Sequence, residues 1–123
     1  MKILVVDDEP QIATMVSDFL RAKGLRVEIA HNGEAALSKF REDPEGFLMV
    51  ISDVRLPDID GLSLYTRIMQ KKKGLPFIFM TGNLDQESSI ASLGKSGGIE
   101  LLLKPFSLFE LYRLIMKYLE PSS

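Results

Sequence analysis

The chain has 123 residues, of which 46% are hydrophobic and 26% are charged, a size and composition typical of one folded domain with one hydrophobic core. The net charge of −2 argues against direct binding to nucleic acid or to an anionic membrane surface, because both require a basic face. The absence of Cys excludes disulfides and thiolate chemistry, and a single His without Cys disfavours a zinc site.

Five short strands are predicted along the chain, the first directly after Met1 and Lys2. Four of them, at 3–6, 47–51, 77–80 and 101–103, are continuous apolar runs, typical of strands buried on both faces of a parallel sheet. Residues 25–29 alternate apolar and charged side chains, which indicates a half-exposed strand near a sheet edge. No run is long enough for a signal peptide or a membrane span, so we expect a cytoplasmic protein.

A helical pattern of apolar residues follows each predicted strand. The first four predicted helices run from Pro10 to before Gly24, from Gly33 to before Pro44, from Leu62 to before Gly74 and, more weakly, from Asp85 to about Lys95. The last helix follows Ser107, a predicted N-cap with Glu110 as its capping-box partner. We therefore expect one domain over residues 1–120 without an internal linker, and a tail or the start of a linker at 121–123.

Repeated strand–helix units with right-handed crossovers predict an α/β fold, a doubly wound five-stranded parallel sheet of the flavodoxin-like (βα)5 type with strand order 2-1-3-4-5. In such sheets the functional site forms at the carboxyl ends of the strands, where the winding reverses between strands one and three. Those two strands end at Asp7-Asp8 and, one Ser later, at Asp53, while strands four and five end at Thr81 and Lys104. Three carboxylates, a hydroxyl and an ammonium are therefore predicted to converge at one edge of the sheet.

This combination of side chains suits phosphate chemistry. Two carboxylates about 4 Å apart repel each other by roughly 4 kcal/mol at an effective dielectric constant of 20, so the cluster requires a cation or a raised pKa. Ligands that are all oxygen favour Mg2+ or Mn2+, and a carboxylate beside such an ion can accept a phosphoryl group. The simpler explanation, that each residue merely caps a strand end, suits one such residue better than five in this order.

Four segments, 4–10, 52–61, 81–82 and 103–106, match in order the motifs of bacterial response-regulator receiver domains, so the chain resembles that family over its whole length and is similar to its single-domain chemotaxis regulators. The resemblance implies that Asp53 accepts a phosphoryl group from a histidine kinase or phosphotransfer protein. It also implies that Asp8, Asp53 and the backbone carbonyl of Arg55 bind Mg2+ directly, and that Asp7 acts through water. Such a domain is not a turnover enzyme, although it assists its own phosphorylation and dephosphorylation, and it signals to a downstream protein target or effector domain.

The remaining motif positions correspond to the family's switch. The resemblance implies that Lys104, which precedes a cis Pro105, contacts the phosphoryl group, that Thr81 moves inward to bond it, and that Gly82 leaves room for it. Leu101 occupies the position of the family's switch aromatic but has no ring to rotate.

Arg55 and Asn83 stand at positions where the family tunes the lifetime of the phosphoryl group.

The last helix carries apolar residues over an arc of about 220°, more than one buried face needs. Phe109, Tyr112 and Met116 form one flank of this surplus. The family uses the face made by its fourth helix, fifth strand and fifth helix for dimers and targets, which favours a partner surface here, such as a homodimer contact. Ordinary half-exposed apolar residues are the other explanation.

Three other functions are alternatives to phosphorelay signalling. A phosphatase of the haloacid-dehalogenase type needs an Asp-x-Asp motif after the first strand, where this chain has Asp7-Asp8-Glu9. A flavodoxin-like FMN binder needs a Ser/Thr/Gly-rich loop at the same place. A pseudo-receiver, which binds a partner without phosphorylation, is the main alternative, and Leu101 is the residue that favours it.

Overall fold

The computed structural model describes residues 1–82 and 99–119; the predicted helix at 85–95, Asn83 and the predicted tail lie outside these ranges. The elements in chain order are β1 (Lys2–Val6), α1 (Pro10–Ala22), β2 (Arg26–Ala30), α2 (Gly33–Glu42), a short 3-10 turn (Pro44–Gly46), β3 (Phe47–Asp53), α3 (Gly61–Lys71), β4 (Phe77–Thr81), β5 (Ile99–Leu103) and α5 (Leu108–Leu119). All strand pairs are parallel, and the sheet has the predicted order β2-β1-β3-β4-β5.

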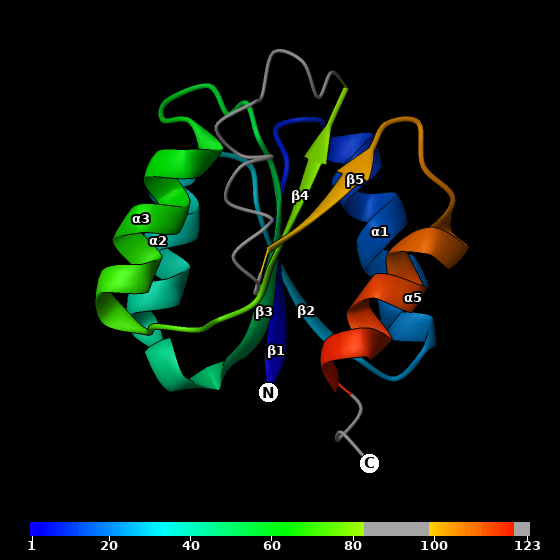
Figure 1. The fold of residues 1–123 in the computed structure, drawn as a ribbon, viewed down its shortest axis with the longest axis horizontal. Helices are drawn as coiled ribbons and strands as arrows, with labels where there is room; N and C mark the ends of the chain where they lie inside the picture. The colour runs from blue at the N-terminus through cyan, green and yellow to red at the C-terminus, as the bar shows by residue number, and fades with distance from the viewer. Residues whose placement is uncertain (83–98, 120–123) are drawn as a thin grey trace.

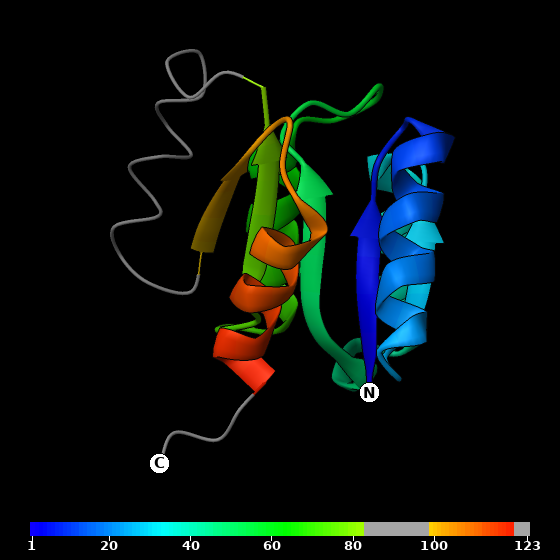
Figure 2. The ribbon, with the colours of Figure 1, turned by 90° about the vertical axis from the view of Figure 1, so that its right-hand side faces the viewer.

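The helices cover the sheet on both sides, with α2 and α3 against one face and α1 and α5 against the other (Figure 1). Figure 2 looks onto the α1–α5 side, where β1, β3 and β4 run side by side and point the same way. Successive residues of a strand face opposite layers, so Leu4 and Val6 pack on the α2–α3 side while Ile3 and Val5 pack on the α1–α5 side. This two-sided burial explains why β1 is a continuous apolar run, fully buried from Ile3 to Val6.

The helix ends follow the predicted local signals. Gly24 and Gly74 have positive φ angles of 87° and 84° just beyond α1 and α3, a conformation that glycine adopts without strain. The Ser107 hydroxyl accepts a hydrogen bond from the Glu110 N–H at 3.1 Å, as expected of an N-cap. Within the two described ranges, no helix is long and apolar enough to cross a membrane.

Candidate functional site

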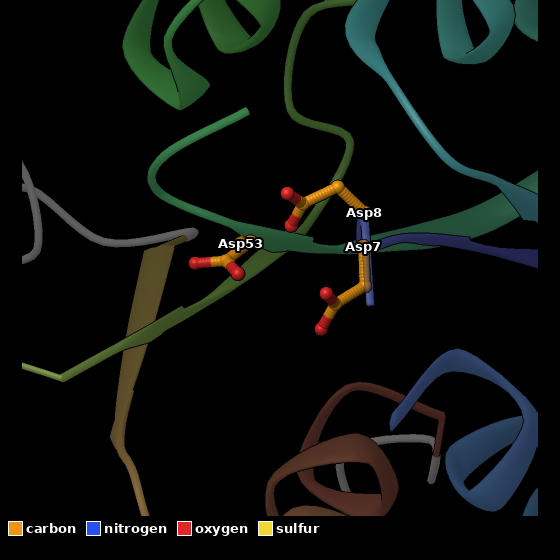
Figure 3. Close-up of side chains that lie close together, drawn as sticks. All are labelled: Asp7, Asp8 and Asp53. Carbon is orange, nitrogen blue, oxygen red and sulfur yellow. The ribbon is translucent and has the colours of Figure 1, made fainter. Parts of the chain in front are cut away.

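The carboxyl ends of β1 and β3 bring three carboxylates together. Val6 is paired with Ser52 in the parallel register, so the residues that follow them, Asp7 and Asp53, emerge side by side. Carboxylate oxygens of Asp7, Asp8 and Asp53 lie within 4.8 Å of one another (Figure 3). The structure thus places the predicted acidic cluster at the point where the winding of the sheet reverses.

The three carboxylates differ strongly in their surroundings. Asp7 is fully buried, the Asp53 side chain is 13% exposed, and Asp8 is exposed. One Asp7 oxygen, Oδ1, accepts the Glu9 N–H at 2.9 Å, but Oδ2 has no hydrogen-bond partner among the described residues. Burial raises the pKa of the Asp7 carboxyl, and the Asp53 and Glu9 carboxylates add to that effect, whereas the Glu9 N–H and Lys104 oppose it.

Lys104 supplies the positive charge of the site. Its Nζ lies 2.9 Å from Asp53 Oδ2 and 3.8 Å from Asp7 Oδ2. Its backbone N–H donates to the Thr81 carbonyl at 2.7 Å, and the bond to Pro105 is cis, as the resemblance implied. Burial lowers the pKa of the Lys104 ammonium, but the hydrogen bond to Asp53 and the nearby carboxylates outweigh it, so the net pKa is raised and the group is charged at neutral pH.

Glu9 joins the rim of the site and was not predicted to do so. Its Oε1 lies 3.9 Å from Lys104 Nζ, on a side chain that is 62% exposed. Its position directly after Asp7 and Asp8 was the only signal in the sequence. The contact is identified only by the folded structure, in which the Lys104 side chain, beyond the end of β5, reaches toward Glu9, beyond the end of β1.

Thr81 is the last residue of β4, and Gly82 follows it at the same edge of the sheet. Thr81 is buried, with 3% exposure, and lies one residue beyond Met80, the partner of Asp53 in the register. Gly82 is exposed, and a Cβ added there would meet no described atom within 4 Å. A close contact within the described part of the chain therefore does not explain the glycine.

Leu101 lies away from this edge, in the middle of β5. It is half-buried beside Phe79 and packs against the core on the α2–α3 side. Asn83 lies outside the described residues.

The β3–α3 loop closes the site on the side of Asp53. Exposed Arg55 forms an antiparallel bridge with Asp60, and the Gly61 N–H donates to the Val54 carbonyl at 2.6 Å. The Asp60 carboxylate then caps α3 by accepting the Ser63 N–H at 2.7 Å. The loop is therefore anchored on both sides of Arg55.

The residues present suit a divalent cation. All side-chain donors in the cluster are carboxylate oxygens, which Mg2+ and Mn2+ prefer. Asp7 Oδ2 also indicates a cation, since this buried oxygen has no hydrogen-bond partner among the described residues. Burial of such an atom is costly unless a charged or polar group compensates it. The cluster can hold one hard ion beside an acceptor carboxylate.

The apolar flank of α5 that the sequence predicts is covered in part by α1. Tyr112 makes an edge-to-face contact with Phe19 of α1 at 5.9 Å, so this flank faces α1. The side of α5 that faces β5 carries Lys117 and Tyr118, which both donate to the Glu100 carboxylate. Phe109 is 81% exposed, and together with Tyr112, Met116 and neighbouring residues it lines a shallow pocket of about 470 Å³. The rotation of α5 on the sheet, which one helix's sequence does not specify, determines which residues of the flank are covered.

Comparison with known proteins connects this site to a family. The sequence model described as response regulator receiver domain matches residues 3–116. The chain is 35% identical over 123 residues to the transcriptional regulatory protein TrcR of Mycobacterium tuberculosis, an alignment that covers all of this chain and 47% of that protein. The chain thus spans about half the length of this relative, and likewise 45% of the probable transcriptional regulatory protein TcrX of the same organism.

Solved structures of response regulators have a similar fold. A response regulator receiver domain protein from Clostridium thermocellum has a TM-score of 0.86 at 29% identity, with 95% of this chain and 92% of that chain covered. The response regulator TrrA from Thermotoga maritima, solved in complex with Mg2+ and BeF, has a TM-score of 0.81 at 35% identity, with 96% and 99% covered.

Proposed function

The chain belongs to the family of response regulator receiver domains, and from this premise we propose that Asp53 receives a phosphoryl group in a two-component phosphorelay. Receiver domains are signalling domains of such systems. The observation that carries the proposal is the environment of the Asp53 carboxylate, which is partly accessible, bonded to Lys104 at 2.9 Å and grouped with Asp7 and Asp8.

The cation site follows from the same cluster. Asp8, Asp53 and the backbone carbonyl of Arg55 would hold Mg2+ or Mn2+ directly, and Asp7 would hold it through water. When bound, the ion supplies positive charge that neutralises the transferring phosphoryl group. The supporting observations are the oxygen-only donor set and the unpartnered, buried Asp7 Oδ2.

In the transfer step, a carboxylate oxygen of Asp53 attacks the phosphorus of a phosphohistidine on a histidine kinase or phosphotransfer protein. The new P–O bond forms as the P–N bond breaks, and the imidazole leaves with the bonding electron pair and takes up a proton. Lys104, already at 2.9 Å from Asp53, pairs with a phosphoryl oxygen. Thr81 donates its hydroxyl to another phosphoryl oxygen, Gly82 leaves room beside it, and Arg55 and Asn83 tune how long the group persists.

Phosphorylation adds a charge of roughly −1.5 to −2 at the end of β3. Thr81 and Lys104 move toward this added charge, and their movement alters the output surface. Lys104 joins β5 to α5 through a short connection, so its movement reaches α5 directly. Leu101 has no ring or hydroxyl, so this chain does not use an aromatic rotation at that position. A pseudo-receiver, regulated without phosphorylation, is the second candidate, and Leu101 is the observation that favours it.

We also propose the biological setting. The domain comprises residues 1–120, with 121–123 as a tail or the start of a linker, and it acts in the cytoplasm on a downstream protein target or effector domain. The flank of α5 at Phe109, Tyr112 and Met116 is proposed as a contact for a second copy of the chain, supported by the 81% exposure of Phe109 beside the half-buried Tyr112 and Met116.

The test is phosphorylation by acetyl phosphate with Mg2+, followed by intact-mass spectrometry. The wild type should gain the mass of one phosphoryl group, and Asp53→Asn, which keeps the shape of the side chain, should gain none. Asp18→Asn, at an exposed position of α1, is the matched control and should behave as the wild type. A wild type that gains nothing from any phosphodonor would support the pseudo-receiver, and a modified Asp53→Asn would mean that another residue is the acceptor.

A further inference from the structure

Asp58 lies at the tip of the β3–α3 loop, and its carboxylate bonds a different helix from the one that the loop enters. Oδ1 accepts the N–H of Gly33 at 2.8 Å, and Oδ2 accepts the N–H of Glu34 at 2.8 Å. Oδ1 also accepts the N–H of Ile59 at 2.9 Å, within the loop itself. Gly33 and Glu34 are the first two residues of α2, where N–H groups have no partner inside the helix.

The start of α2 already has a cap of its own. The Asn32 side chain accepts the N–H of Ala35 at 2.7 Å, which is the usual N-cap bond. Asp58 serves the two N–H groups that Asn32 does not reach. Removing either side chain should therefore weaken the start of α2, but only the loss of Asp58 also releases the tip of the loop.

The loop and the helix also fit closely in space. A Cβ on Gly33 would lie 2.2 Å from Cγ1 of Ile59 and 3.2 Å from Oδ1 of Asp58. The φ angle of Gly33 is not positive, so close approach of the loop, rather than an unusual backbone conformation, requires the glycine there.

The clamp at Asp58 lies on the same loop as a proposed cation ligand. Arg55 bridges Asp60 near the base of the loop, and the Gly61 N–H bond to Val54 fixes that base to the end of β3. Arg55 therefore lies between an anchor at the sheet and an anchor at α2. We propose that Asp58 is a positioning residue, which clamps the loop to the start of α2 and so holds the backbone carbonyl of Arg55 in the cation site. This inference rests on the proposed function of that site.

The proposal separates cation affinity from the chemical step. Residues that orient metal ligands typically change metal affinity by about 10- to 100-fold when removed. Asp58→Ala leaves every proposed ligand in place, so we expect an effect at the lower end of this range. The half-saturating Mg2+ concentration for phosphorylation by acetyl phosphate should increase about tenfold. The rate at saturating Mg2+ should change by less than about twofold, because the ion itself pulls the carbonyl back into place.

Direct binding gives a second readout, since Mn2+ titration followed by electron paramagnetic resonance needs no phosphodonor. Asp58→Ala should weaken Mn2+ binding by the same factor. Gly33→Ala should do so as well, because its Cβ displaces the loop from the helix side without altering any loop residue. Asn32→Ala is the matched control, which removes the helix's own cap and should leave Mn2+ affinity unchanged.

The possible results separate a failure of the proposed cation site from a failure of the Asp58 clamp. A wild type that binds no Mn2+ would overturn the proposed function itself. A wild type that binds Mn2+ while Asp58→Ala binds equally well would overturn the clamp alone. An Asn32→Ala variant as weak as Asp58→Ala would also overturn it, by assigning the effect to loosening of α2. Far-UV circular dichroism checks that each variant is folded, and Asp58→Asn, which keeps one acceptor oxygen, should fall between the wild type and Asp58→Ala.

Discussion

Replacing Asp7 with Asn should stabilise the protein when no divalent cation is available. The Asp7 carboxylate is fully buried, and its Oδ2 has no hydrogen-bond partner among the described residues. Burial raises its pKa above the ordinary value of 3.8. A folded-state pKa above the unfolded one means that ionised Asp7 costs folding free energy at neutral pH, and that this cost disappears below about pH 3.8.

The size of the effect follows from the charges around Asp7. At an effective dielectric constant of about 20, carboxylates within 4.8 Å repel by at least about 3.5 kcal/mol each, and Lys104 at 3.8 Å attracts by about 4 kcal/mol. The repulsion from Asp8 counts for less, because Asp8 is exposed and screened by solvent. An unpaired buried oxygen costs a further 1–3 kcal/mol or so, part of which the Asn amide retains. We expect Asp7→Asn to raise the free energy of unfolding by about 1–3 kcal/mol. Each kcal/mol should raise Tm by about 3–5 °C.

Urea unfolding followed by circular dichroism tests this, with the wild type, Asp7→Asn and the surface control Asp18→Asn each measured in EDTA and in excess Mg2+. In EDTA, Asp7→Asn should unfold at higher urea with an unchanged m-value, while Asp18→Asn follows the wild type. If Mg2+ binds the proposed site in the folded state, it should stabilise the wild type, and it should stabilise Asp7→Asn less. The reasoning is refuted if Asp7→Asn is no more stable than the wild type in EDTA.

Three further predictions concern other parts of the molecule. Gly61→Ala should lower the unfolding free energy by about 1–3 kcal/mol in urea, because its Cβ would lie 2.9 Å from the Val54 carbonyl oxygen, and an unchanged midpoint would contradict this. Burial and the Glu100 carboxylate raise the pKa of Tyr118 to about 12, so its contribution to stability is complete below pH 10 and is lost as the pH rises through about 12. Glu100→Gln should return the ultraviolet titration of Tyr118 toward 10, and an unmoved titration would show that Glu100 is not a cause. Phe109→Glu should weaken self-association of the beryllofluoride-treated protein in sedimentation without changing its urea midpoint, because Phe109 is 81% exposed, and unaltered sedimentation would contradict the proposed contact.

Much of the fold could be predicted because its signals are local. Continuous apolar runs such as Ile3–Val6 identify strands covered on both faces, and Gly24 and Gly74 mark helix ends where a positive φ is needed. Strand–helix alternation then leaves few arrangements of the sheet, since crossovers are right-handed. The convergence of Asp7, Asp8 and Asp53 followed from that topology, because the carboxyl ends of parallel strands share one edge.

Contacts between distant segments could not be predicted in the same way. The sequence around Asp58 predicts only an ordinary turn residue. Its carboxylate nevertheless accepts hydrogen bonds from N–H groups 24 and 25 residues away. Glu9 reads as the start of a helix, yet it faces Lys104 across the site. The surplus apolar arc of α5 was visible in its periodicity, but its direction, toward Phe19 of α1, depends on how the helix rolls on the sheet.

The sequence by itself thus determined the order of the elements, the sheet topology and the residue types that meet at its carboxyl edge, because periodicity, turn residues and chirality act over a few residues. Only the tertiary structure decided how those residues are partnered. Burial leaves one Asp7 oxygen without a hydrogen bond among the described residues, Lys104 lies nearest to Asp53, and the start of α2 holds the loop that carries Arg55. These are matters of distance and solvent exclusion between segments far apart in the chain, and they arise only when the sheet and its helices pack together.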